Sequence, residues 1–210
     1  MKKIILVLIS LLVISLSQAQ IKAVTETGEE VNLYDDGTWK YQSKYQSLAK
    51  EIPVNLSIFK KDKESTFLLR SKNLNLGIYL DPKKWSFKKG TTNPYAEYEL
   101  NFKDGDLYGT VITEKIEIPL EALKSLAFES AKAISPDLTI VKEEYRIVNG
   151  LKVLLLRMNG TIKGIKFSYY GYYFSSTNGT IQFITYTSQK LLDSYIAESE
   201  KLLNGLIEIN

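Results

Sequence analysis

The 210-residue sequence contains no cysteine and no histidine. Without cysteine, no disulfide can hold the fold together, so packing has to do so alone. Without histidine, the chain lacks the usual general base of catalytic triads and the side chain that nearly all zinc sites need. Only carboxylate, lysine and tyrosine side chains remain for acid–base chemistry. We therefore expect no metal and no cofactor.

Catalytic motifs are also missing. The sequence has no glycine-rich phosphate loop, no P-loop lysine motif and no nucleophile elbow. Two carboxylate pairs occur, Asp104 with Asp106 around a glycine and Glu143 with Glu144 within a strand-like run. Glycosidase-type catalysis needs two carboxylates about 5 to 10 Å apart across a cleft, whereas adjacent strand residues point to opposite faces. The sequence therefore favours a protein that is not an enzyme.

The N-terminus has the features of a signal peptide. Lys2 and Lys3 precede the apolar run Ile4–Leu16, and Ser17-Gln18-Ala19 then places small residues before a cleavage site. The apolar run is too short to span a bilayer comfortably. We predict that residues 1–19 are removed and that the mature protein, without a transmembrane span, is exported through the inner membrane to the periplasm. The extracellular space and a retained membrane anchor are the alternatives.

The mature chain is almost neutral. Removal of the two signal-peptide lysines leaves 25 basic and 24 acidic residues, a net charge of +1. Binding of nucleic acid needs a broad positive field, so we expect no nucleic-acid partner. The length that remains suggests one domain with a small appendage.

Residues 20–42 predict a small β-meander. Asp36-Gly37 lies between two short β-prone runs, and Asp-Gly is a strong hairpin signal. A two-residue turn there would place Tyr34 opposite Trp39 as a cross-strand aromatic pair. Residues 43–52 are polar and are expected to form a linker.

The main domain, residues 53–210, combines strand-like runs with two helices. Pro119 suits a first helical position, and Pro136 disfavours helical geometry in the residue before it, which bounds one helix. Ser188 as N-cap and Asn204-Gly205 as the stop bound the other. Strands are expected over the apolar runs on either side of a charged turn at 60–64 and over Leu74–Leu80, Ala96–Phe102, Gly109–Ile118, Leu138–Val148, Leu151–Met158, Ile165–Ser175 and Thr180–Thr187.

The stretch KFSYYGYYFSSTNG, residues 166–179, is rich in tyrosine. A two-residue turn at Asn178-Gly179 would pair Phe174 with Phe183. Because side chains alternate, the strand is apolar on both faces and needs a cover on both, which the two helices can supply. Most of the rings are therefore expected in the core, and the alternative is a ligand site at a tyrosine-rich rim. One face would carry Tyr170, Tyr172 and Phe174, and the other Phe167, Tyr169 and Tyr173.

A series of landmarks runs in order along residues 53–207. A strand is followed by a Pro-x-x-Trp motif at Pro82 and Trp85, and a helix follows Pro119. A later strand ends in Val-Asn-Gly, and the aromatic hairpin and an amphipathic helix come after it. This order resembles the PsbP family, named after the extrinsic photosystem II subunit, whose fold a Ran-binding nuclear transport factor shares. The resemblance implies an α+β fold, an antiparallel β-sheet sandwiched between helices (α/β/α). It also implies a non-catalytic role, while histidine-containing metal positions of the family cannot be carried over.

Basic and aromatic residues interleave in the segment DPKKWSFKKG. The cluster could bind an anionic polymer, a glycan or a lipid headgroup. The alternative is a strand end whose aromatic rings point inward while the lysines stay solvated. We take this cluster as the preferred partner surface and the meander's Tyr34 and Trp39 as the second. The cluster's residues are Lys83, Lys84, Trp85, Lys88 and Lys89.

Together these features predict an exported binding or assembly module without chemistry of its own. Its partner would be an unknown protein or an anionic component of the cell envelope. Two alternatives are a small-ligand carrier with a tyrosine-rich rim and an enzyme that uses carboxylates and tyrosine on an envelope glycan. No motif in the sequence specifies a ligand or an oligomeric state.

Overall fold

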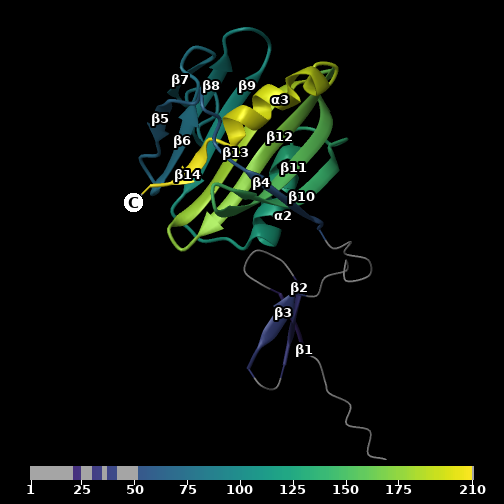
Figure 1. Cartoon of the computed structure of the whole chain (residues 1–210). Coiled ribbons are helices and arrows are strands. Elements are labelled where there is room, and N and C mark those ends of the chain that lie inside the picture. Colours follow the sequence, from purple (N-terminus) through teal and green to yellow (C-terminus); the bar gives the residue numbers. More distant parts are fainter. Residues whose placement is uncertain (1–20, 25–29, 35–36, 42–51, 210) are drawn as a thin grey trace, which may run out of the picture. The chain divides into compact units, whose positions relative to one another are not determined.

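The computed structural model describes residues 21–24, 30–34, 37–41 and 52–209, and the chain divides into two units between residues 51 and 52 (Figure 1). The predicted signal peptide, residues 1–19, lies outside the described residues, as does most of the predicted linker. None of the helices that the structure describes is long and apolar enough to cross a membrane.

The smaller unit contains a three-stranded antiparallel sheet of β1 (Ile21–Val24), β2 (Glu30–Leu33) and β3 (Trp39–Tyr41). Leu33, not Tyr34, lies opposite Trp39, so the predicted aromatic pair is wrong. The backbone N–H of Tyr34 instead donates to the carbonyl of Thr38 at 2.9 Å. Gly37, which precedes Thr38, has a φ of 81°, a left-handed conformation that favours glycine.

The larger unit is built on an eight-stranded sheet. All neighbouring strands are antiparallel except β4, which runs parallel to β10, so the prediction of a wholly antiparallel sheet is wrong at this edge. Parallel neighbours require a long crossover connection, and here the chain between them supplies five other strands and a helix. The order across the sheet is β4 (Val54–Phe59), β10 (Thr139–Val148), β11 (Leu151–Ile162), β12 (Ile165–Ser176), β13 (Gly179–Ser188), β9 (Tyr108–Glu114), β8 (Ala96–Phe102) and β7 (Trp85–Lys89).

A second, three-stranded sheet has the order β14 (Leu206–Glu208), β6 (Leu76–Leu80) and β5 (Phe67–Arg70). The two helices of the unit are α2 (Leu120–Lys132) and α3 (Leu192–Leu203). α2 begins one residue after the predicted start, because Pro119 is its N-cap residue rather than its first helical residue. Ser188 does not cap α3, because it still pairs with Phe167 as the last residue of β13.

The aromatic strand β12 is core on both faces, as alternation predicted. Tyr170, Tyr172 and Phe174 belong to one buried cluster, which includes Leu202 of α3 and much of the second sheet. Phe167 and Tyr173 belong to another, which includes Leu123 and Ala127 of α2. One face is therefore covered by α3 together with a second sheet and the other by α2, so the α/β/α description holds only in part.

The hairpin between β12 and β13 has a different register from the predicted one. Phe174 lies opposite Ile181, not Phe183, because Ser176 pairs with Gly179 and the turn falls one residue earlier. A side chain on Gly179 would collide with the carbonyl of Glu114 in β9. This glycine therefore serves close strand packing rather than the turn itself.

Candidate binding sites

The residues of the predicted lysine cluster do not share one side of the edge strand β7. Trp85 is only 3% exposed and packs against Phe102 at a ring-centroid distance of 5.2 Å. Most of its side chain therefore packs in the core, as the inward alternative foresaw, although one edge of it lines the cleft described below. Lys89 lies on the same side of β7 as Trp85, whereas Lys88 lies on the other, because side chains alternate along a strand.

Two of the four lysines already have carboxylate partners. The ammonium of Lys88 lies 3.0 Å from Glu99, and that of Lys84 lies 2.9 Å from Glu198. The hydrogen bond from Lys88, with backbone N–H groups of the loop that follows β7, lowers the pKa of Glu99 to about 2. Lys83 and Lys89 are exposed and form no ion pair with any described residue.

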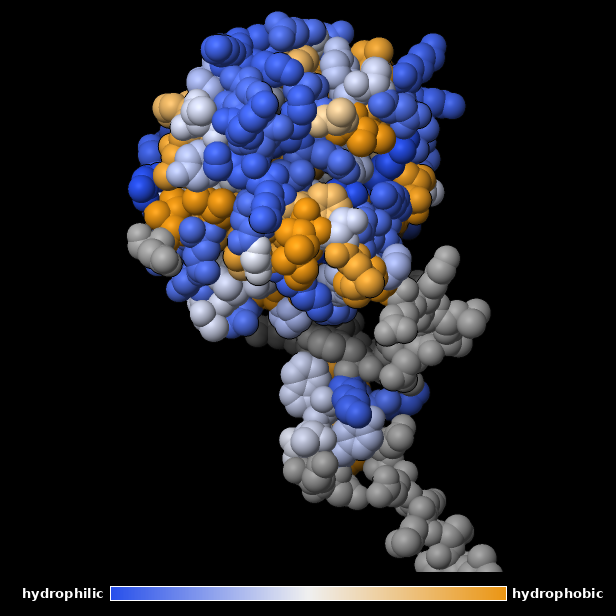
Figure 2. All heavy atoms as spheres, viewed as in Figure 1, coloured by the Kyte–Doolittle hydropathy of each residue, from blue (hydrophilic) through white to orange (hydrophobic). Residues whose placement is uncertain are grey.

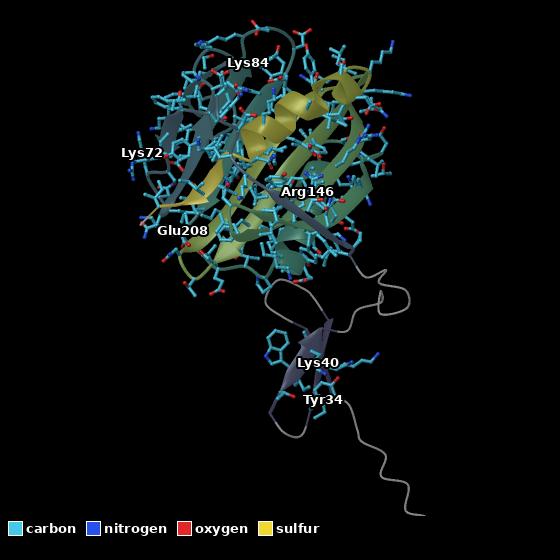
Figure 3. All side chains as sticks on the ribbon, viewed as in Figure 1. Tyr34, Lys40, Lys72, Lys84, Arg146 and Glu208 are labelled. Carbon is cyan, nitrogen blue, oxygen red and sulfur yellow. The ribbon has the colours of Figure 1, made fainter. Side chains whose placement is uncertain are left out.

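The two aromatic residues predicted as a second surface lie in the smaller unit. Trp39 is 51% exposed. Tyr34 is half-buried, and the ammonium of Lys40 lies 5.7 Å from its ring centroid (Figure 3). These residues are therefore not the cross-strand pair that the sequence predicted.

Buried hydroxyl groups of the tyrosine strand are bound by an arginine. Arg146 of β10 is 3% exposed, and its guanidinium donates to the hydroxyls of Tyr172 and Tyr170 at 3.0 and 3.3 Å (Figure 3). The hydroxyl of Tyr170 donates to Glu200 of α3 at 2.6 Å, and that of Tyr172 donates to Asn204 at 2.8 Å. Burial raises the pKa of Tyr172 to about 12. These tyrosines are thus satisfied core residues, which argues against a carrier with a tyrosine-rich rim.

Two carboxylates neutralise this buried arginine. The guanidinium of Arg146 donates to Glu144 at 2.6 Å and to Glu200 at 2.8 Å, and it lies 4.3 Å from the ring centroid of Phe59. Burial disfavours the charged form of Glu144, but hydrogen bonds from Arg146 and Asn55 outweigh it, so its pKa is lowered. We call Arg146, Glu144, Glu200, Tyr170 and Tyr172 the arginine network.

The two carboxylate pairs do not form a catalytic site. Glu143 pairs with Lys124 of α2, whereas Glu144 faces the arginine network, so the two point to opposite faces as predicted. Asp104 and Asp106 are exposed in the loop before β9. Among the described residues, no group of acidic side chains is arranged to hold a metal ion.

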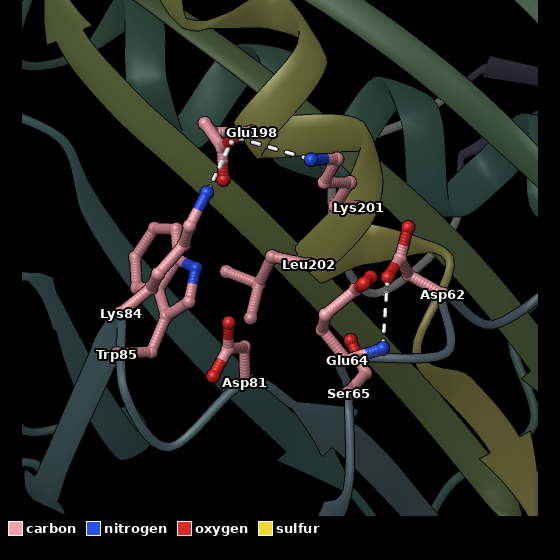
Figure 4. A pocket seen from close by; sticks show the side chains of 9 residues that line it. All are labelled: Asp62, Glu64, Ser65, Asp81, Lys84, Trp85, Glu198, Lys201 and Leu202. Carbon is pink, nitrogen blue, oxygen red and sulfur yellow. Dashed lines mark hydrogen bonds and ion pairs between the residues drawn. The ribbon is translucent and has the colours of Figure 1, made fainter.

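A cleft of about 280 Å³ opens beside Trp85 (Figure 4). Three segments that are distant in the sequence form it: the β4–β5 loop, the β6–β7 turn and α3. Asp81 shapes the turn by accepting the backbone N–H of Lys83 on its side chain at 2.8 Å. Asp62 accepts the N–H of Glu64 in the same way at 3.0 Å. The residues that line this Trp85 cleft are Asp62, Glu64, Ser65, Asp81, Lys84, Trp85, Glu198, Lys201 and Leu202.

Charge in the Trp85 cleft is unevenly compensated. Glu198 lies between Lys84 at 2.9 Å and Lys201 at 3.4 Å (Figure 4). Its hydrogen bond raises the pKa of Lys84. Hydrogen bonds from Glu64 lower the pKa of Asp62, which therefore stays ionised. The sequence offered no signal for this cleft, because its carboxylates come from segments without a shared motif.

Aliphatic side chains on the edge strand β4 are exposed. Val54, Leu56 and Ile58 are 56%, 89% and 73% exposed, and Ile147 of the adjacent β10 is 39% exposed. Val54 lies opposite Tyr145, which packs with α2, so this row lies on the α2 side of the sheet, beyond the reach of the helix. On the face shown in Figure 2, apolar residues form separate patches between hydrophilic ones. Elsewhere the half-exposed rings of Phe67 and Phe87 lie 5.4 Å apart. We call Val54, Leu56, Ile58 and Ile147 the β4–β10 patch.

The alternation of apolar and polar residues in VNLSIF was a signal for this row. What it could not reveal is that the apolar side would remain uncovered, because that depends on the position of α2.

Comparison with known proteins identifies the fold. No model of a known protein family matches the chain, and no curated protein matches it. Among solved structures, cyanobacterial PsbP (CyanoP) from Synechocystis sp. PCC 6803 is similar, with a TM-score of 0.51 and 13% sequence identity. The match covers 70% of this chain and 94% of that chain. The chain therefore has a PsbP-like fold, as its landmarks predicted.

Two further structures are more distantly similar. LpqN, described as involved in cell envelope biogenesis of Mycobacterium tuberculosis, has a TM-score of 0.46 and 10% identity, covering 62% of this chain and 81% of its own. PA94 from Pseudomonas aeruginosa, described as a protein of unknown function and putative regulator, has a TM-score of 0.43 and 11% identity, covering 67% and 95%. At such identities, likeness concerns the fold and leaves function to the sites.

Proposed function

We propose that the protein is an exported, non-catalytic binding module that holds a protein partner at the β4–β10 patch. The observation that carries this proposal is the row of exposed aliphatic side chains on β4, with Leu56 89% exposed. The partner would present an extended segment with apolar residues at alternate positions. Such a segment adds to an open sheet edge through backbone hydrogen bonds and gains specificity from alternate side chains.

The two edges of the large sheet support this assignment by their contrast. The edge strand β7 carries Lys88 and Lys89, and lysines at an edge discourage pairing with another chain. β4 has no charged residue between Val54 and Phe59 and, among the described strands, pairs on one side only. An apolar edge without such protection is expected where pairing with a partner is the function.

Two parts of the proposal, export and the absence of catalysis, are supported by the N-terminal sequence and by the contacts of the carboxylates. The charged start, apolar run and small residues of the first 19 positions support export. Glu143 and Glu144 are engaged with a lysine and an arginine rather than with each other. This proposal keeps two secondary contact sites. The exposed Lys83 and Lys89 would contact an anionic envelope component, and Tyr34 and Trp39 of the smaller unit form the other site.

The test replaces the apolar row with charge. The double variant Leu56→Lys, Ile58→Lys should fold normally, since exposed substitutions usually change stability by within about 0.5 kcal/mol. Leu126→Lys is the matched control, because Leu126 is 53% exposed on α2, outside the patch. Site-specific crosslinking at the exposed Ser57 of β4 in whole cells then measures partner capture for each variant.

We expect crosslinked protein with the wild type and the Leu126→Lys control and a loss of at least tenfold with the double variant. Unchanged capture by the double variant would overturn the proposal. If the crosslinked species is a second copy of this chain, the patch is a self-association surface, which light scattering of the purified protein would show independently.

A further inference from the structure

The indole of Trp85 has an unused hydrogen-bond donor. Although Trp85 is 3% exposed, its N–H forms no hydrogen bond with any residue that the structure describes. The nitrogen is not among the buried unpaired side-chain atoms of the described residues, so it is accessible from the cleft that Trp85 lines. In Figure 4 the indole nitrogen is directed into the Trp85 cleft, towards the space beside Leu202. The cleft is therefore shaped to receive an acceptor atom.

The rim of the cleft carries uncompensated negative charge. Lys84 and Lys201 both lie within ion-pair distance of the one carboxylate of Glu198. Asp62, Glu64 and Asp81 also line the cleft, so four carboxylates face two ammonium groups. Of these three, Glu64 has an exposed ion pair outside the lining, with Lys63 at 3.7 Å, and exposed pairs are weak. The apolar part of the wall comes from Leu202 and Trp85 (Figure 4).

We propose that the Trp85 cleft binds a small amino compound that also carries an oxygen acceptor. Its primary ammonium group is held at the carboxylate rim by Glu64 and Asp81, its aliphatic stem lies along Leu202 and the indole, and its oxygen accepts the Trp85 N–H. A primary ammonium group has three hydrogen-bond donors and no acceptor, so it can donate directly to carboxylate oxygens. The volume of about 280 Å³ is just below the usual range for drug-sized ligands, which restricts the ligand to a small molecule.

Other ligand classes fit the cleft less well. A small anion would meet the excess of carboxylates, and the two lysines are already held by Glu198. Among the described residues, no acidic group has the arrangement for a metal ion. The site is independent of the proposed partner surface, since it lies beside α3 and the β4–β10 patch lies on the α2 side of the sheet.

The protein supplies its own reporter for this site. It contains two tryptophans, so the full-length variant Trp39→Phe has Trp85 as its only tryptophan. The probe is 6-aminohexan-1-ol, titrated while the emission of Trp85 is followed. Three matched compounds each remove one feature: hexane-1,6-diol lacks the charge, hexylamine lacks the oxygen, and 6-hydroxyhexanoate reverses the charge.

We expect 6-aminohexan-1-ol to change the emission of Trp85 saturably, with hexylamine binding more weakly and the other two compounds not binding. Glu64→Gln and Asp81→Asn should each raise the Kd by about tenfold, as expected when a hydrogen bond to a charged group is lost. Glu129→Gln, which removes an exposed carboxylate of α2, is the control and should leave the Kd unchanged. Binding should weaken with salt.

Three results would overturn the proposal. Equal binding of hexane-1,6-diol would show that the cleft recognises only the apolar stem. Preference for 6-hydroxyhexanoate would assign the cleft to anions through its lysines. No emission change with any probe would show that the cleft does not take this class of ligand. None of these outcomes affects the crosslinking test of the β4–β10 patch.

Discussion

Replacing Arg146 with leucine tests the arginine network. The substitution removes a buried cation that donates to two carboxylates and two tyrosine hydroxyls. It leaves Glu144, whose side chain is 12% exposed, with the half-exposed Lys142 at 3.4 Å as its remaining cationic partner. Breaking a buried ion pair by removing one partner costs about 3 to 5 kcal/mol. For a domain of this size that loss lowers Tm by about 10 °C.

Urea unfolding followed by circular dichroism measures the change, and Arg157→Leu is the matched control. Arg157 pairs with Asp193, whose side chain is 80% exposed, and such pairs contribute about 1 kcal/mol or less. An unchanged m value would show that Arg146→Leu altered stability rather than the compactness of either state.

The pH dependence supplies a second signature. The folded-state pKa of Glu144 is lowered below its unfolded value, so its contribution to stability is present above about pH 4.3 and is lost as the pH falls through the folded pKa. Arg146→Leu removes this contribution, so the stability difference from wild type should shrink at acid pH. A loss of less than about 1 kcal/mol with a parallel pH profile would refute the reasoning.

Three further predictions concern the rest of the chain. Phe174→Ala should destabilise by about 3 to 5 kcal/mol because Phe174 is 8% exposed in the core, and near-normal thermal unfolding would contradict that. EDTA and dithiothreitol should each leave Tm unchanged, because the chain has neither histidine nor cysteine; a fall of several degrees with EDTA would reveal an all-oxygen cation site. The intact mass of the exported protein should correspond to a chain that begins at Gln20, and a mass that includes Met1 would refute signal cleavage.

Local patterns predicted the elements and their faces well. Alternation along β12 assigned Tyr172 and Tyr173 to opposite sides of the sheet, because side-chain direction depends only on neighbouring residues. The helix after Pro119 followed from backbone restrictions that act within one turn. The resemblance added the order of the landmarks, and a solved structure of similar fold confirmed it.

Features that depend on distant segments were missed. The hairpin register differs by one turn position. Gly179 at this turn lies close to Glu114 of β9, a contact that no local pattern reports. The parallel pairing of β4 depends on where the chain returns to the sheet after five other strands and a helix. The inward Trp85, in contrast, was the alternative stated for the lysine cluster. The arginine network had a faint signal, since Glu144 and Arg146 alternate onto the same face as the apolar Val148. The partners of these two residues on α3 could not be inferred.

The strand β14 has a consequence for how the protein reaches its folded state. It follows α3 and pairs with β6, and Leu206 in it is completely buried. The amide of Asn149 further donates to the carbonyls of Asn204 and Leu206 at 2.7 and 2.8 Å. Contacts between segments so distant in the sequence form late, since the loop between them has to close first. A chain that is delivered with its N-terminus first therefore cannot complete this fold until β14 is present.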